Sequence, residues 1–144
     1  MIMDTRISEI MTKDVITVPP GKPLREITTL FKKHHVRHIP VVKNNCLKGI
    51  VSLSDIMRMS FGNKFGEVES DVDEAIFEML SLDQVMVRKV KTVTPDMFVK
   101  EVAEMLTKEE FHALPVVEGE KLVGIVTTTD IIRHLVKLNY TTRE

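Results

Sequence analysis

The stretch "GIVSLSDIM" (Gly49–Met57) is written again 75 residues later as "GIVTTTDII" (Gly124–Ile132). Both versions contain Gly-Ile-Val and an aspartate that follows hydroxyl-bearing side chains. Aligned at this offset, residues 10–58 match residues 85–133 without a gap, with 17 of 49 positions identical. Unrelated stretches of ordinary composition would share about three. The chain therefore carries two copies of one structural unit.

The composition is that of an ordinary soluble domain. The 144 residues are 43% hydrophobic and 28% charged, with a net charge of −1, which gives no general attraction to nucleic acid or to an anionic membrane. No apolar run approaches the roughly 18 residues of a membrane span. The single cysteine, Cys46, excludes an internal disulfide framework and fits a reducing compartment. We therefore expect a cytoplasmic protein with neither a nucleic-acid nor a membrane partner.

Each copy is expected to fold as a strand, a helix, two strands and a closing helix. Short β-branched runs that end at prolines predict the first strands, and apolar residues at helical spacing predict the helices. The first strands are 15–18 and 90–93, the first helices lie around 24–31 and 98–106, the later strands are 36–42, 47–52, 111–117 and 122–127, and the last helices begin near Asp55 and Asp130. The order β-α-β-β-α, present twice, indicates an α/β (α+β) fold with two repeats packed about a pseudo-twofold axis.

The expected domain organisation follows from the repeat. The first repeat covers 7–60, a linker 61–81, the second repeat 82–138 and a flexible tail 139–144. The linker is predicted to contain a short amphipathic helix, because four apolar side chains fall on one helical face: Val72, Ile76, Met79 and Leu80.

The repeated hydroxyl–aspartate groups allow two interpretations. Serine, threonine and aspartate are favoured at helix N-caps, where a side-chain oxygen accepts an unpaired backbone N–H. One oxygen is enough for a cap, however, and each copy supplies three oxygen-bearing side chains. A carboxylate at a helix start can also accept both hydroxyls of a ribose, and the free N–H groups there can hold an anion. Both interpretations remain open from the residues alone.

Both copies resemble the cystathionine-β-synthase (CBS) domain, and the whole is similar to a tandem CBS pair, or Bateman module. The resemblance rests on three patterns that occur in order in both copies: V-x-T-V-x-P, (R/H)-x-(I/L)-P-V-V and G-I-V-(S/T)-x-x-D-I. The segment Gly49–Ile56 is also similar to stretches in the nucleotide-sensing subunit of AMP-activated protein kinase. The resemblance covers most of the chain.

The resemblance implies two clefts between the repeats, each of which binds an adenosine-containing ligand. In each cleft the aspartate motif of one repeat would hold the ribose, while the other repeat would cover the base and reach the phosphates. Site 1 would consist of Thr17, Val36, Arg37, His38, Pro40, Thr127, Thr129 and Asp130. Site 2 would consist of Ser52, Ser54, Asp55, Thr92, Phe111, His112, Ala113 and Pro115.

The two sites are expected to differ in how they hold phosphate. Arg37 and His38 occupy positions where family members place phosphate-contacting side chains, whereas the second copy offers His112 and Ala113. An arginine presents a fork of donors and a neutral histidine only one. We therefore predict tighter phosphate binding at the site that contains Asp130 and Arg37.

Other reactive side chains carry weaker signals. His34 and His38 are four residues apart, but Val36 begins a strand, and no carboxylate or cysteine stands near them to complete a metal site. His134 is interpreted as a surface residue whose charge suits the C-terminal end of the last helix. Cys46 lies in a turn without spaced catalytic partners. No metal site and no catalytic residue are predicted.

These features favour a stand-alone regulatory module over an enzyme. The ligand would be AMP, ADP, ATP or S-adenosylmethionine, acting as a regulatory ligand rather than a cofactor, and its bound state would be passed to an unidentified protein partner. Like other tandem CBS chains, this one is expected to form a homodimer through its helices. The alternative is a structural module for dimerisation or assembly, with empty clefts. The sequence contains no Walker-type phosphate loop and no nucleophile–base pair that would indicate catalysis.

Overall fold

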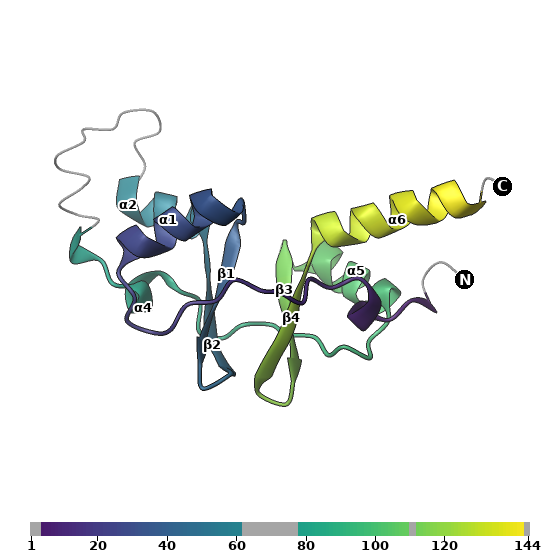
Figure 1. Cartoon of the computed structure of the whole chain (residues 1–144), viewed down its shortest axis with the longest axis horizontal. Coiled ribbons are helices and arrows are strands. Elements are labelled where there is room, and N and C mark those ends of the chain that lie inside the picture. Colours follow the sequence, from purple (N-terminus) through teal and green to yellow (C-terminus); the bar gives the residue numbers. More distant parts are fainter. Residues whose placement is uncertain (1–3, 62–77, 110–111, 143–144) are drawn as a thin grey trace. The chain divides into compact units, whose positions relative to one another are not determined.

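A computed structural model of the chain describes residues 4–61, 78–109 and 112–142. They form two compact units, one of residues 16–89 and one that combines residues 1–15 with residues 90–144. Each unit contains a β-hairpin with helices beside it (Figure 1). The mixed α/β fold with two repeats of the same elements, predicted from the sequence, is confirmed.

The unit of residues 16–89 contains the elements of the first repeat and one short helix beyond it. Helix α1 (Leu24–His34) precedes strands β1 (His38–Lys43) and β2 (Cys46–Ser52), and helix α2 (Leu53–Phe61) follows without a loop. Helix α4 (Leu82–Val85) packs in this unit as well.

The β1–β2 turn forms because two asparagines accept left-handed backbone angles. Asn44 and Asn45 have φ angles of 53° and 66°, which asparagine tolerates better than most residues. The strands pair antiparallel from His38 opposite Ser52 to Lys43 opposite Cys46, with a bulge at Val41/Val42. This register sets the start of β1 beside the start of α2.

The second unit repeats the plan with different residues. Helix α5 (Val99–Lys108) precedes strands β3 (Ala113–Glu118) and β4 (Lys121–Thr127), and helix α6 (Thr128–Thr142) follows directly. The hairpin again bulges at its fourth and fifth residues, between Val116 and Val117. A short 3-10 helix, η2 (Ile7–Glu9), from the N-terminal part of the chain, completes this unit.

Each unit has its own apolar core. The spacing of apolar residues in α1 and α5 turns one face of each helix inward, as predicted for Leu24, Ile27 and Phe31 in α1 and for Val102 and Leu106 in α5. Val99 is also buried, whereas Phe98, predicted to lie on this face, is the N-cap of α5 and 37% exposed. Both cores also contain a fully buried residue from the segment that leads into the other copy. Ile7 lies in the core of the second repeat, and Leu82 lies in that of the first.

The leading segments are held by backbone hydrogen bonds as well as by burial. Ile7 N–H donates to Met97 O at 2.8 Å, and Thr12 exchanges hydrogen bonds of 2.8 and 3.0 Å with Ile125. In the other unit Val87 exchanges hydrogen bonds of 2.8 and 3.0 Å with Ile50. These segments are therefore integral parts of the units in which they pack.

The predicted first strands are wrong in detail. Val18 forms a single parallel bridge to Val41, and Val93 forms one to Val116, rather than strands over 15–18 and 90–93. The prolines that follow have no N–H and turn the chain away, so pairing cannot continue.

The end of the predicted linker and most of the predicted tail lie within the described residues. Val72 and Ile76 of the predicted linker helix lie outside the described residues, whereas Met79 is exposed and Leu80 packs against the first core. Helix α6 continues to Thr142, through four of the six residues expected to form a flexible tail.

Candidate functional site

A reciprocal cap fixes Asp130 at the start of α6. The Asp130 backbone N–H donates to Thr127 Oγ1 at 3.1 Å, and the Thr127 N–H donates to Asp130 Oδ2 at 2.9 Å. Asp130 Oδ1 faces Arg133 Nη1 at 3.4 Å. Among the residues whose burial is described, Asp130 is the only buried charged side chain, 8% exposed. Its carboxylate is therefore held in one orientation, where the helix dipole also favours a negative charge.

The corresponding cap on α2 is looser. The Asp55 backbone N–H donates to Ser52 Oγ at 3.1 Å, and the Ser52 and Ser54 hydroxyls lie 3.2 Å apart. The Asp55 carboxylate pairs with Arg58 at 3.1 Å and is a quarter exposed. Asp55 is thus more accessible to solvent than Asp130.

The capping interpretation is confirmed for both copies. Ser52 and Thr127 supply the cap oxygen, and one carboxylate oxygen of Asp130 accepts a backbone N–H of its own unit. Among the described residues, the second oxygen, Oδ1, pairs with a largely exposed arginine. The cap thus leaves oxygen capacity at Asp130, and the ribose-binding role of both aspartates stays a prediction.

The first repeat brings its predicted phosphate-side residues close to its own aspartate motif. The Arg37 carbonyl accepts the Leu53 N–H at 3.0 Å, and His38 pairs with Ser52 in the β1–β2 register. The remaining predicted residues of this repeat are an exposed Thr17, a half-buried Val36 and a buried Pro40.

The second repeat shows the same local arrangement. The His112 carbonyl accepts the Thr128 N–H at 3.0 Å, and Ala113 pairs with Thr127. Thr92 is half-buried, Thr129 is exposed and Pro115 is buried, while Phe111 lies outside the described residues. Within each unit the two motifs are neighbours. The joining of half-sites from the two repeats into one cleft stays a prediction.

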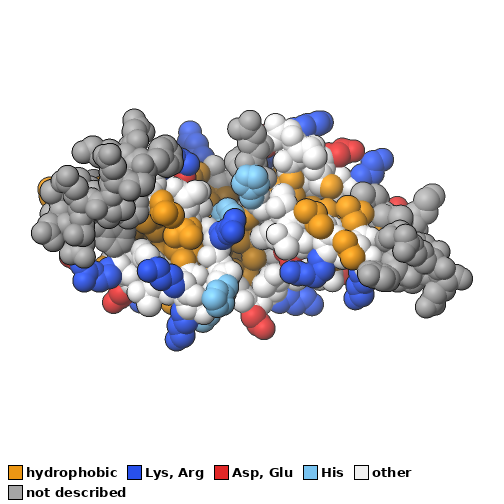
Figure 2. Space-filling view, turned by 90° about the horizontal axis from the view of Figure 1, so that it is seen from above, with side chains coloured by type: hydrophobic (Ala, Val, Ile, Leu, Met, Phe, Trp, Pro, Cys, Tyr) orange, Lys and Arg blue, Asp and Glu red, His pale blue; other side chains and the backbone are white. Residues whose placement is uncertain are grey.

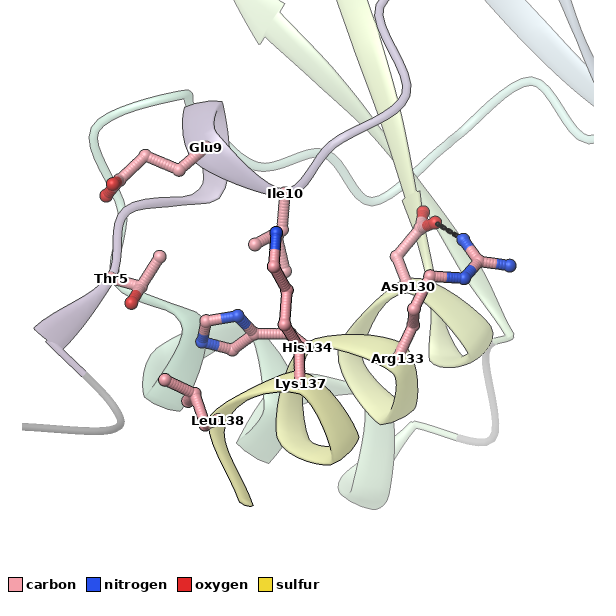
Figure 3. A pocket seen from close by; sticks show the side chains of 8 residues that line it. All are labelled: Thr5, Glu9, Ile10, Asp130, Arg133, His134, Lys137 and Leu138. Atoms are coloured by element: carbon pink, nitrogen blue, oxygen red, sulfur yellow. Dashed lines mark hydrogen bonds and ion pairs between the residues drawn. The ribbon is translucent and has the colours of Figure 1, made fainter. Parts of the chain in front are cut away.

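A cavity of about 350 Å³ lies between α6 and the N-terminal segment of the same unit. Its lining comes from one face of α6 and from the residues around η2 (Figure 3): Thr5, Glu9, Ile10, Asp130, Arg133, His134, Lys137 and Leu138. Apart from Asp130, none of these residues is among the site residues predicted from the sequence. Their spacing from Asp130 by three, four, seven and eight residues along a helix is the signal that could have indicated a shared face.

The interpretation of His134 as a residue near a helix C-terminus is wrong. Helix α6 runs to Thr142, so His134 lies in its middle, half-buried in the cavity wall. The helix dipole acts mainly within the first and last turns and has little effect there.

Beside the cavity, an arginine anchors the N-terminal segment. The Arg6 guanidinium donates to Asp96 O at 2.6 Å and lies over the Phe98 ring, 4.8 Å from its centre. The Thr94 hydroxyl, which donates to the Asp96 carboxylate at 2.6 Å, holds the pKa of Asp96 below its ordinary value, and Arg6 adds a smaller effect in the same direction.

The described part of the chain contains neither a metal-binding cluster nor a membrane-spanning helix. Among the described residues, no three His, Cys, Asp or Glu side chains converge closely enough to hold a metal ion. Within the same residues, every helix is too short or too polar to cross a bilayer.

Comparison with known proteins identifies the repeats. The model of the CBS domain family matches residues 7–62 and 82–137. The Methanocaldococcus jannaschii protein MJ0188 is 33% identical over 132 residues, which are 91% of this chain and 44% of that protein.

Two solved structures share the fold over most of the chain. The CBS domain pair of MJ0100, crystallised with 5′-methylthioadenosine and S-adenosyl-L-methionine, superposes with a TM-score of 0.78 at 28% identity and covers 93% of this chain and 98% of that one. MJ1225 of M. jannaschii, described as a putative archaeal homologue of γ-AMPK, gives a TM-score of 0.80 at 26% identity and covers 92% and 48%. The chain thus spans less than half the length of MJ0188 and of MJ1225. With both family matches in order along one chain, this protein belongs to the CBS domain family and carries two CBS domains in tandem.

Proposed function

We propose that this chain is a regulatory module that binds an adenosine-containing ligand and passes the bound state to a partner protein. The candidate ligands are AMP, ADP, ATP and S-adenosylmethionine. A ligand shifts a conformational equilibrium only through different affinities for the two states. In this proposal the ligand shifts the equilibrium through contacts with Asp130. The hydrogen bonds between Asp130 and Thr127 hold this side chain at the junction of β4 and α6.

The observation that carries the proposal is the buried, oriented carboxylate of Asp130. Burying a charged side chain is costly unless its oxygens are satisfied, and a cap alone needs only one side-chain oxygen. The second oxygen faces Arg133, whose side chain is 73% exposed. Because the guanidinium is largely exposed to water and lies 3.4 Å from the carboxylate oxygen, the pair is weak, and a ribose hydroxyl can replace the guanidinium at small cost. The complex of the MJ0100 pair with two adenosine compounds supports this ligand class.

Asp130→Asn tests the ribose role separately from the cap. The asparagine oxygen can still accept the Thr127 N–H, so the helix stays capped, while the charge that strengthens a hydroxyl–carboxylate bond is lost. We expect calorimetry with AMP, ADP, ATP and S-adenosylmethionine to show a loss of about tenfold or more for whichever compound binds wild type. The melting temperature without ligand should change little.

Asp55→Asn is the matched control in the first copy. We expect it to lower the affinity for phosphate-bearing ligands less than Asp130→Asn does. Asp55 is less firmly oriented, and the predicted second site lacks the counterpart of Arg37. Equal losses would refute the asymmetry. Failure of all four compounds to bind wild type, or to raise its melting temperature at millimolar concentration, would refute the proposed function.

A second candidate function is assembly of two copies through the helices. Helix α6 exposes an apolar stripe of Ile132, Leu135 and Val136, and α2 exposes Met57. Figure 2 shows hydrophobic side chains at the surface of the face that carries α6, toward the right of the view. Exposed apolar patches of this kind are typical of protein interfaces.

Ile132→Glu combined with Val136→Glu tests the assembly. Because a charge in the centre of an apolar interface is left unpaired, the double variant should sediment as a monomer if wild type is a dimer. A dimer that survives both charges would exclude this face as the interface. A wild-type monomer at micromolar concentration would exclude homodimerisation itself.

A further inference from the structure

The cavity between η2 and α6 has walls of different chemistry. The α6 wall carries three nitrogen-bearing side chains, Arg133, His134 and Lys137, and the opposite wall carries Thr5 and Glu9. In Figure 3 the Lys137 side chain rises from α6 toward Ile10, and the His134 ring lies on the Thr5 side. A volume of about 350 Å³ is within the range of small-molecule sites.

Both carboxylates in the lining are already bound to backbone N–H groups. Glu9 Oε2 accepts the Arg6 N–H at 2.9 Å, and Asp130 Oδ2 accepts the Thr127 N–H at 2.9 Å. Their charges therefore serve mainly as helix caps. The lining also contains two charged N–H donors, Lys137 and Arg133, of which Arg133 pairs with Asp130. Charged donors of this kind match a phosphate or carboxylate.

We propose that this cavity binds the anionic tail of the ligand whose ribose is held at Asp130, which in a nucleotide is the phosphate. This inference rests on the proposed function and adds a location for the tail. A ribose hydroxyl that donates to Asp130 Oδ1 displaces Arg133 from its 3.4 Å pair, and the freed guanidinium then turns to the tail. Arg133 and Lys137 lie about 4.5 and 10.5 Å from Asp130 along the helix axis, so their side chains line the path of a sugar phosphate.

The first repeat lacks this arrangement and therefore provides an internal control. Arg58 pairs with Asp55 as Arg133 does with Asp130. At the positions equivalent to His134 and Lys137, 75 residues earlier, the sequence has Met59 and Gly62. The tail site is thus specific to the second copy.

Calorimetry with adenosine and AMP tests the inference. Wild type should bind AMP more tightly than adenosine, because only AMP has the anionic tail. Lys137→Met should lower the affinity for AMP about tenfold, which is the effect of losing one charged hydrogen bond, and leave the affinity for adenosine unchanged. Arg133→Met should also reduce the difference in affinity between AMP and adenosine, whereas the control Arg58→Met should leave this difference as in wild type. Residues 133 and 137 are exposed, so unliganded melting temperatures should stay the same and would reveal any misfolded variant.

Three results would overturn the inference. Lys137→Met could keep the full difference in affinity between AMP and adenosine while Arg37→Met removes it. In that case the tail binds at Arg37, and the proposed function survives but the tail site in the α6 cavity does not. Equal affinity of wild type for AMP and adenosine would mean that no side chain binds the anionic tail. If neither ligand binds wild type, the inference fails, and the proposed function fails with it only if ADP, ATP and S-adenosylmethionine do not bind either.

Discussion

Ile7→Ala is expected to lower the free energy of unfolding by about 3 kcal/mol, which is typical of truncating a fully buried isoleucine. Ile7 is 0% exposed and packs with Val93, Val99 and Val102 in the core of the second repeat. Its backbone N–H also donates to Met97 O, so the segment cannot easily shift to fill the cavity left by the substitution. Urea denaturation followed by circular dichroism would measure the loss.

Two isoleucines on the same unit serve as controls for this prediction. Ile10 is half-buried against the same core, and Ile10→Ala should cost about 1 kcal/mol. Ile132 is 60% exposed in the single chain, and Ile132→Ala should change the stability of the monomer by less than about 0.5 kcal/mol. If Ile7→Ala were as mild as Ile132→Ala, the N-terminal segment would be a dispensable arm rather than part of the core.

The elements with local signals were predictable from the sequence. Helix α1 follows from apolar residues at 24, 27 and 31, because one face of a helix repeats every three or four residues. The β1–β2 turn follows from Asn44 and Asn45, whose side chains tolerate left-handed angles. The caps at Ser52 and Thr127 follow from hydroxyl and acidic side chains at the start of a helix.

The packing of the leading segments was not predictable in this way. Ile7 and Leu82 occupy equivalent positions at the 75-residue offset and are both apolar, so the repeat indicates that both are buried but not in which core. Their partners are distant in sequence, as with Ser8 N–H and Pro95 O, which are 3.0 Å apart. Periodicity reports which face of an element is buried, but not which core buries it.

The same limit applies to the candidate site. Asp130 was recognised because its motif is repeated, whereas Lys137 has only glycine at the equivalent position of the first copy. The cavity also needs a wall from residues 5–10, and the sequence could not place that segment against α6. Only Asp130 of this site is a repeated residue in a shared motif, so the repeat alone does not indicate the other residues of the cavity.

Gly49→Ala is expected to be among the most destabilising single substitutions in the first repeat, at about 3 kcal/mol. A Cβ built at Gly49 would lie 2.7 Å from Val87 O and 3.1 Å from Met86 Sδ. Val87 O cannot retreat freely, because it accepts the Ile50 N–H at 3.0 Å while the Val87 N–H donates back to Ile50 O. The glycine of the repeated motif is therefore needed where the leading segment crosses β2. Hydrogen exchange at Ile50 and Val87 should accelerate in the variant if the crossing is what breaks.

Gly124→Ala separates this explanation from a general requirement for glycine in the motif. A Cβ at Gly124 would meet Met11 Sδ at 2.7 Å and Thr12 O at 3.0 Å. Because the nearest atom is the end of a flexible side chain that can change rotamer, most of the clash can be relieved. Alanine also loses less backbone entropy on folding than glycine, and this offsets about 0.5–1 kcal/mol of the destabilisation at either position. The loss should therefore be about 1 kcal/mol, clearly smaller than at Gly49. Equal losses, or a larger loss at Gly124, would contradict the view that a backbone carbonyl fixed by the crossing makes Gly49 the more demanding position.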